Sequence, residues 1–125
     1  MKRIEMIVER TRSGYSAYAK KYSVATTGKN LNELKENIVE ALNLYFEEKG
    51  RRITAADIKV ILDLPQFFEF YRVINAKALS ERIGMNQSLL AQYISGKKKP
   101  SAAQTERIFK GVRQLGKELS ELDLV

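Results

Sequence analysis

The sequence predicts an α+β protein, in which a small β-β-β-α-β domain is followed by an all-α helix-turn-helix domain. Three observations support this prediction. Apolar and polar residues alternate near the N-terminus, which is typical of half-buried strands. Apolar residues then recur at helical spacing over residues 31–45. Short helical segments follow Pro65, so the expected domains span residues 1–64 and 65–125.

Alternation and turn residues predict the strands of the first domain. Residues 3–10 place Ile4, Met6 and Val8 on one face, and this face is expected to be buried. Gly14 belongs to a turn signal that separates this segment from the next one. The other strands are expected over residues 15–19, 23–26 and 58–64.

A capping pattern predicts where the helix of the first domain begins. Asn30 is a good N-cap residue, and Glu33 follows it three places on. Gly50 is the expected stop signal. The buried face is expected to consist of Leu31, Leu34, Ile38, Leu42 and Tyr45.

The second domain is predicted to contain only helices. Asp63 is expected to cap the first of them, with Pro65 in its first turn and the Gln66 side chain reaching back to the cap. Phe67, Phe70, Tyr71 and Ile74 are expected to line one side of this helix. Further helices are expected over residues 76–83 and 87–95 and from Ser101 onwards, where Gln104 completes another capping pattern.

Composition restricts the possible functions. The 125 residues carry a net charge of +7, and residues 72–117 alone contain ten basic residues against two acidic ones, a net +8. A basic protein favours anionic partners, above all nucleic acid. Cysteine and histidine are both missing, which removes thiolate metal sites and the commonest general base. We therefore expect no catalytic residues, no metal and no cofactor. Since long apolar runs and a signal-peptide pattern are also missing, we expect a cytoplasmic protein that does not enter membranes.

Residues 79–101 predict two short helices joined by a tight turn at Gly84. Leu79 and Ile83 give the first helix an apolar face, and Asn86 can cap the second. Such a helix-turn-helix places its second helix in the major groove of double-stranded DNA. The residues left facing outward are Gln87, Ser88, Ala91, Gln92 and Ser95, and the Gln and Ser side chains among them are suited to pairing with base edges. The residues expected to hold phosphates are Lys97, Lys98 and Lys99, with help from Lys77 and Arg82.

The same residues resemble a known family. LSERIGMNQS at 79–88 and YISGKKKPS at 93–101 are similar to the Xre/Cro-type helix-turn-helix. In that family an aromatic residue near the helix end precedes a Gly-Lys-x-Lys-Pro-Ser segment. The resemblance covers roughly residues 66–117. It implies that Gln87, Ser88, Ala91 and Gln92 take base-facing positions and that Asn86 is the cap that often touches a phosphate.

The first domain resembles the HicB antitoxins. The matching segments are GYSAY at 14–18, TGKNLNEL at 27–34 and ENIVEAL at 36–42. This resemblance implies a partial RNase H-like β-β-β-α-β fold, a small HicA-like toxin as a partner, and repression of the protein's own operon. The chain departs from the family where KKYS, residues 20–23, replaces a Leu-Pro-Gly-Cys-like segment. A stand-alone regulator without a toxin is therefore an alternative.

Two other functions of the first domain are less favoured. A metal-dependent nuclease would need convergent carboxylates, and the candidates Glu5, Glu9, Asp57 and Asp63 are spread over the predicted strands, so this is the least favoured alternative. Stacking of single-stranded RNA on Tyr15, Tyr18 and Tyr22 is less favoured than packing of these rings.

The last helix carries apolar residues at spacings of four and three. Ile108, Val112 and Leu115 are expected to pack mainly within the domain. The end of the chain is expected to form the interface of a homodimer or higher even oligomer, which would place two recognition helices about 34 Å apart, one DNA turn. The interface residues are expected to be Leu119, Leu122 and Leu124.

Overall fold

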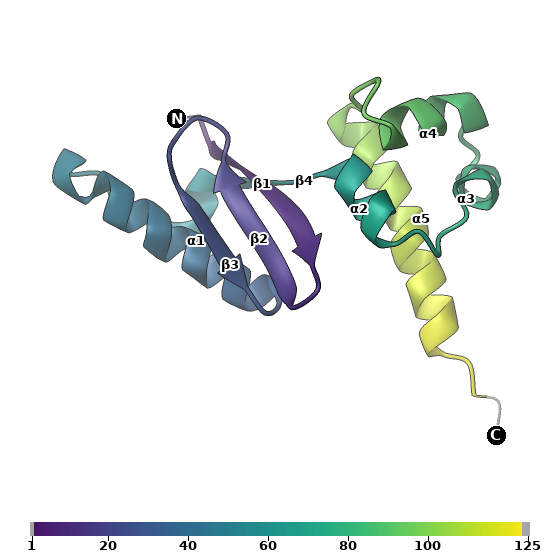
Figure 1. The fold of residues 1–125 in the computed structure, drawn as a ribbon, viewed down its shortest axis with the longest axis horizontal. Coiled ribbons are helices and arrows are strands. Elements are labelled where there is room, and N and C mark those ends of the chain that lie inside the picture. Colours follow the sequence, from purple (N-terminus) through teal and green to yellow (C-terminus); the bar gives the residue numbers. More distant parts are fainter. Residues whose placement is uncertain (1, 124–125) are drawn as a thin grey trace. The chain divides into compact units, whose positions relative to one another are not determined.

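A computed structural model describes residues 2–123. The chain forms two compact units, Met1–Phe70 (unit 1) and Tyr71–Val125 (unit 2), and each is considered by itself. Unit 1 contains a four-stranded sheet, and Figure 1 shows this sheet and the helices that follow it. The predicted α+β class, with strands first and helices after them, is confirmed.

Unit 1 is built on one mixed sheet in the order β3-β2-β1-β4. Strand β1 lies between β2, which is antiparallel to it, and β4, which is parallel to it. The elements are β1 (Ile4–Thr11), β2 (Gly14–Ala19), β3 (Ala25–Gly28), α1 (Leu31–Phe46) and β4 (Ile58–Leu62). Short 3-10 turns at Glu47–Lys49 and Ala55–Asp57 lie between α1 and β4. The β-β-β-α-β order is as predicted, although the third strand begins two residues later than the sequence suggested.

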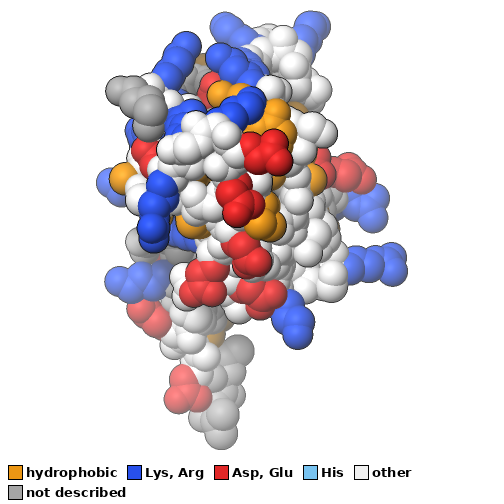
Figure 2. Space-filling view, turned by 90° about the vertical axis from the view of Figure 1, so that its left-hand side faces the viewer, with side chains coloured by type: hydrophobic (Ala, Val, Ile, Leu, Met, Phe, Trp, Pro, Cys, Tyr) orange, Lys and Arg blue, Asp and Glu red, His pale blue; other side chains and the backbone are white. Residues whose placement is uncertain are grey.

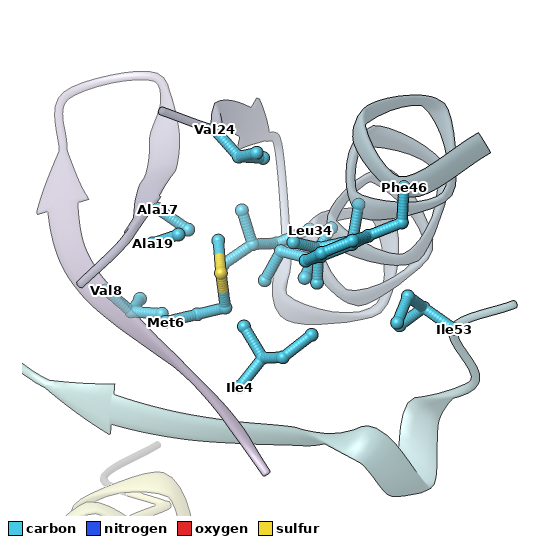
Figure 3. Packing of buried hydrophobic residues seen from close by; sticks show 11 residues of the cluster. Ile4, Met6, Val8, Ala17, Ala19, Val24, Leu34, Phe46 and Ile53 are labelled. Carbon is cyan, nitrogen blue, oxygen red and sulfur yellow. The ribbon is translucent and has the colours of Figure 1, made fainter. Parts of the chain in front are cut away.

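The core of unit 1 lies between the sheet and α1. The alternation in β1 has the predicted effect, because Ile4, Met6 and Val8 are buried while the residues between them are only half-buried. Figure 3 shows these side chains directed toward those of α1. The core cluster consists of Ile4, Met6, Val8, Ala17, Ala19, Val24, Leu34, Ile38, Leu42, Phe46 and Ile53.

Helix α1 begins as predicted, since the Asn30 side chain accepts a hydrogen bond from the Glu33 amide at 2.8 Å. Its buried face differs from the prediction at both ends. Leu31 is 47% exposed and Tyr45 is 38% exposed, while Phe46 is buried in their place. Four buried positions, Leu34, Ile38, Leu42 and Phe46, follow a strict four-residue spacing. The predicted buried face was therefore correct in the middle of the helix and wrong at Leu31 and Tyr45.

Two side-chain amides of unit 1 bind both backbone groups of a single residue, as a neighbouring strand would. Asn43 accepts from the Ile53 amide at 2.7 Å and donates to the Ile53 carbonyl at 3.0 Å. Gln66 does the same for Arg10, with distances of 2.9 and 2.6 Å. Each pair satisfies a backbone donor and a backbone acceptor that regular structure leaves open.

Helix α2 (Leu64–Phe70) belongs to unit 1. Asp63 caps it as predicted, accepting from the Gln66 amide at 3.1 Å. The prediction that the Gln66 side chain reaches back to the cap is wrong, because that side chain binds Arg10 instead. The helix ends at Phe70, so Tyr71 and Ile74 lie beyond it and do not line its side as predicted, and its buried residues are Leu64 and Phe68.

The described residues of unit 2 form three helices, α3 (Ala76–Ile83), α4 (Gln87–Ile94) and α5 (Ala102–Ser120). Asn75 caps α3, and Ser101 caps α5 by accepting from the Gln104 amide at 3.1 Å. The core of this unit is small. Its buried apolar side chains are Leu79, Met85, Leu90, Tyr93 and Ile108.

Candidate nucleic-acid interface

The turn between α3 and α4 is three residues long and follows from its sequence. Gly84 ends α3 with φ +67°, a left-handed conformation that favours glycine. The Met85 amide donates to the Ser80 carbonyl at 2.9 Å, and the Met85 side chain is buried. Asn86 then caps α4, accepting from the Leu89 amide at 3.1 Å. The two helices and the glycine turn thus form the predicted helix-turn-helix arrangement.

Helix α4 has one apolar face and one polar face. Leu90 and Tyr93 are buried, at 1% and 6% exposure. On the other face Gln87, Ser88 and Ala91 are exposed. Gln92, the fourth predicted base-facing residue, is half-buried, so its side chain is less accessible than the other three. The structure therefore brings three of the four predicted positions together on one open surface.

The lysine-rich loop after α4 is folded back onto the end of that helix. Gly96 adopts φ +78°, and the Lys98 amide donates to the Gln92 carbonyl at 3.1 Å. The Lys97 amide lies 3.4 Å from the Ser95 hydroxyl, which accepts from it. The side chains of Lys97, Lys98 and Lys99 are all exposed. Three positive charges are thereby held next to the C-terminal end of α4.

The other predicted phosphate ligands differ in their availability. Lys77 is exposed on α3. The oxygen of the Asn86 side chain is occupied by its capping bond to Leu89. Arg82 is engaged by Glu118 of α5, through hydrogen bonds of 2.7 and 3.2 Å. Of these three residues, Lys77 is the most accessible to a phosphate.

The pair between Arg82 and Glu118 changes the acidity of both groups. Hydrogen bonding to Glu118, together with its charge, raises the pKa of Arg82. Hydrogen bonds from Arg82, and secondly from Gln114, lower the pKa of Glu118. Both side chains are largely accessible to solvent, so this ion pair makes only a small contribution to stability.

Sequence reasoning missed the residues of α5 that hold α3. The Arg107 guanidinium donates to the carbonyls of Ile83 and Gly84. Gly111 gives room for Ile83: a Cβ on this glycine would lie only 2.3 Å from the Ile83 Cγ2. The sequence signal for this contact was Gly111 itself, because a glycine inside a predicted amphipathic helix indicates close packing against a neighbour as well as a lower helix propensity.

The apolar positions of α5 change from buried to exposed along the helix. Ile108 is fully buried, and Val112 and Leu115 are half-buried. Leu119 is 57% exposed, and Leu122, which follows the end of the helix, is 61% exposed. The third predicted interface residue, Leu124, lies outside the described residues.

The alternative sites in unit 1 are not assembled. Asp57 is bound within a capping box with Thr54, and within residues 2–123 no group of three or more metal-ligating side chains could hold an ion. Tyr15 and Tyr22 pack against the core. Tyr18 lies between the buried residues Ala17 and Ala19 of β2, so its side chain is on the opposite face of the sheet, where it is 44% exposed. The three rings therefore do not form one stacking surface.

The exposed face of α1 is acidic. Glu36 and Glu40 are exposed there, as is Leu44 at 67%. Figure 2, which views the molecule from the side where the end of α1 lies in Figure 1, shows acidic and apolar side chains gathered near one another. Such a face repels phosphates, so it is not itself a candidate surface for binding nucleic acid.

Comparisons with protein-family models, with curated proteins and with solved structures found no match for this chain. Among the residues that the structure describes, no helix combines the length and apolar character needed to cross a bilayer.

Proposed function

We propose that this chain is a sequence-specific regulator of transcription that binds double-stranded DNA through unit 2. The observation that carries this proposal is the outward surface of α4. Gln87, Ser88 and Ala91 are exposed together on a helix capped at its N-terminus, and three exposed lysines follow it. Unit 2 has ten basic and five acidic residues, a net charge of +5, so the surroundings also favour a polyanion.

The chemistry of this surface suits base reading in the major groove. The amide of Gln87 can pair with N6 and N7 of adenine, and Ser88 can donate or accept at several base edges. Ala91 offers a methyl group that can contact the thymine methyl. The three lysines of the loop would contact phosphates, which fixes the register of the helix and adds affinity that depends on salt.

A dimer would complete such a regulator. Leu119 and Leu122 are exposed apolar residues at the end of unit 2, and a second copy of the chain could cover them. They would form the two-fold contact that presents two recognition helices to one operator. Because the chain resembles HicB antitoxins followed by an Xre/Cro-type module, we propose that the regulated gene is its own.

A second function is proposed for unit 1, namely neutralisation of a small HicA-like toxin. Ile7 of β1 pairs with Tyr18 of β2 on one side and with Ile61 of β4 on the other, so the three residues form a row across the sheet. This row lies on the face of the sheet opposite the core, where Tyr18 is 44% exposed. Co-expression with the product of an adjacent gene tests this idea. A Tyr18→Glu change should abolish the complex and leave DNA binding intact, and a complex that survives it would count against this surface.

The DNA-binding proposal is tested by comparing two variants on a preferred duplex selected from a randomised pool. Gln87→Ala should weaken binding to that duplex by about 1–3 kcal/mol and relax specificity at one position, because a base contact is lost. Equal weakening on every sequence would refute the base-reading role.

Lys98→Ala tests the phosphate contacts in the same way that Gln87→Ala tests the base contact. It should weaken binding to preferred and scrambled duplexes alike, and it should lower the slope of log K against log salt by about one unit. Fluorescence anisotropy at several salt concentrations measures both quantities. An unchanged slope would exclude Lys98 as a phosphate ligand.

A further inference from the structure

Helix α5 holds the end of α3 through the side chain of Arg107. Its Nε donates to the Ile83 carbonyl at 3.2 Å, and its Nη2 donates to the same carbonyl at 3.0 Å. Nη2 also donates to the Gly84 carbonyl at 2.7 Å. The last carbonyls of a helix have no partner within the helix, so this guanidinium satisfies groups that would otherwise need water.

These bonds act on the turn that leads into α4. Gly84 is the left-handed residue that ends α3, and α4 begins only three residues later. A Cβ on Gly84 would lie 3.4 Å from the Arg107 Nη2, which shows how closely the guanidinium covers the turn. A planar fork of donors fixes direction as well as distance, which a lysine ammonium at the same place would not do.

The same face of α5 approaches α3 at two further points. Gly111, one helical turn after Arg107, leaves the space that Ile83 fills. Glu118, about two turns further on, pairs with Arg82. Arg107 is therefore the end of a longer contact between α5 and α3, and it is the member of that contact that touches the turn itself.

We propose that Arg107 is a positioning residue for sequence recognition. It fixes the turn between α3 and α4, and thereby the direction in which α4 presents Gln87 and Ser88, and it does not bind a phosphate. This inference rests on the proposed function of α4. Arg107 and Lys98 are both exposed, but the Arg107 guanidinium donates to the carbonyls of α3 and its turn, whereas Lys98 is anchored through its backbone amide.

The first test keeps the positive charge at position 107 and removes the planar guanidinium. Arg107→Lys should lower the preference for the selected duplex over a scrambled one about tenfold or more, while affinity for the scrambled duplex and the salt slope stay unchanged. Arg113→Lys is the matched control, because Arg113 lies on the same helix and pairs only with the exposed Glu106 among the contacts seen for it. Preserved preference in Arg107→Lys would overturn the proposal.

The second test separates positioning from phosphate binding. Arg107→Gln removes the charge, and under the proposal its salt slope equals that of wild type. A slope lower by about one unit, with equal weakening on both duplexes, would mean that Arg107 is a phosphate ligand and would overturn the proposal. If the wild-type protein shows no preference between the two duplexes, the proposed function of α4 is refuted. This outcome is measured before any variant, so it is distinct from a failure of the proposal about Arg107.

The third test needs no DNA. The Met85 amide, bonded to the Ser80 carbonyl at 2.9 Å, reports on the turn through hydrogen exchange. Its exchange should accelerate severalfold in Arg107→Lys and stay unchanged in Arg113→Lys, and unchanged exchange in both would overturn the proposal. In wild type, the Nε–H resonance of Arg107 should not move when scrambled duplex is added. A shift as large as that of the lysine loop would contradict the proposal without relying on any variant.

Discussion

Unit 1 buries a cluster of eleven apolar side chains between a sheet and one long helix. Among the described residues of unit 2, five apolar side chains are buried, and they come from three helices and a turn. In unit 2, polar contacts also join α3 to α5, namely the bonds of Arg107 to the turn after α3 and the pair between Arg82 and Glu118. Their charges also differ, +2 for unit 1 and +5 for unit 2. The difference teaches that a small unit with little core depends on a few directed contacts to keep its exposed surface in place.

The largest expected effect concerns the dense packing of unit 1. A Cβ on Gly28 would lie 2.5 Å from the Leu34 amide nitrogen and 2.6 Å from its Cα. Gly28→Ala should therefore push α1 away from β3 and lower the free energy of unfolding by about 3 kcal/mol or more. Urea denaturation measures this change. A loss below about 1 kcal/mol would show that the packing of unit 1 is more adaptable than its core suggests.

A glycine pair in α5 sharpens the comparison within unit 2. Gly111→Ala should lower the free energy of unfolding by about 1–3 kcal/mol, because its Cβ would overlap Ile83. Gly116→Ala is the matched control, since nothing lies within 4 Å of its Cβ, and it should raise stability by about 0.5–1 kcal/mol through helix propensity. Thermal melts followed by circular dichroism decide between them, and equal effects at the two positions would contradict the close contact.

The smallest expected effect is a dependence on pH. The lowered pKa of Glu118 means that its ion pair contributes stability that is present above the ordinary glutamate pKa of about 4.3 and is lost as pH falls through the lowered value. Glu118→Gln should therefore reduce the stability of unit 2 slightly near pH 7 and remove part of its decline in acid. Thermal melts of both proteins from pH 7 to pH 3 test this, and parallel curves would argue against the pair.

Local patterns were sufficient to predict most elements. Alternation identified β1 and β4, and the caps at Asn30, Asn86 and Ser101 act where the sequence placed them. The third strand was misplaced by two residues because β3 is a short edge strand of small and polar residues, in which alternation is weak. Boundaries of such strands depend on their neighbour, which here is β2.

Contacts between distant residues could not be predicted from these patterns. Gln66 binds a residue 56 positions away, and Arg107 binds carbonyls 23 and 24 positions away. In both cases the partner is a backbone group, which carries no sequence signal. For the candidate interface, helical periodicity correctly predicted that Gln87, Ser88 and Ala91 are exposed. It could not predict that Arg82 pairs with Glu118.

The most direct test of the central claim is the affinity for DNA from the region upstream of this protein's own gene. Fluorescence anisotropy would compare that duplex with a scrambled duplex of the same composition over a salt series. Base reading by α4 predicts a preference of about 10³-fold or more for the upstream duplex at physiological salt. Equal and steeply salt-dependent binding to both duplexes would mean that only the lysine-rich loop contacts DNA, and it would contradict the claim.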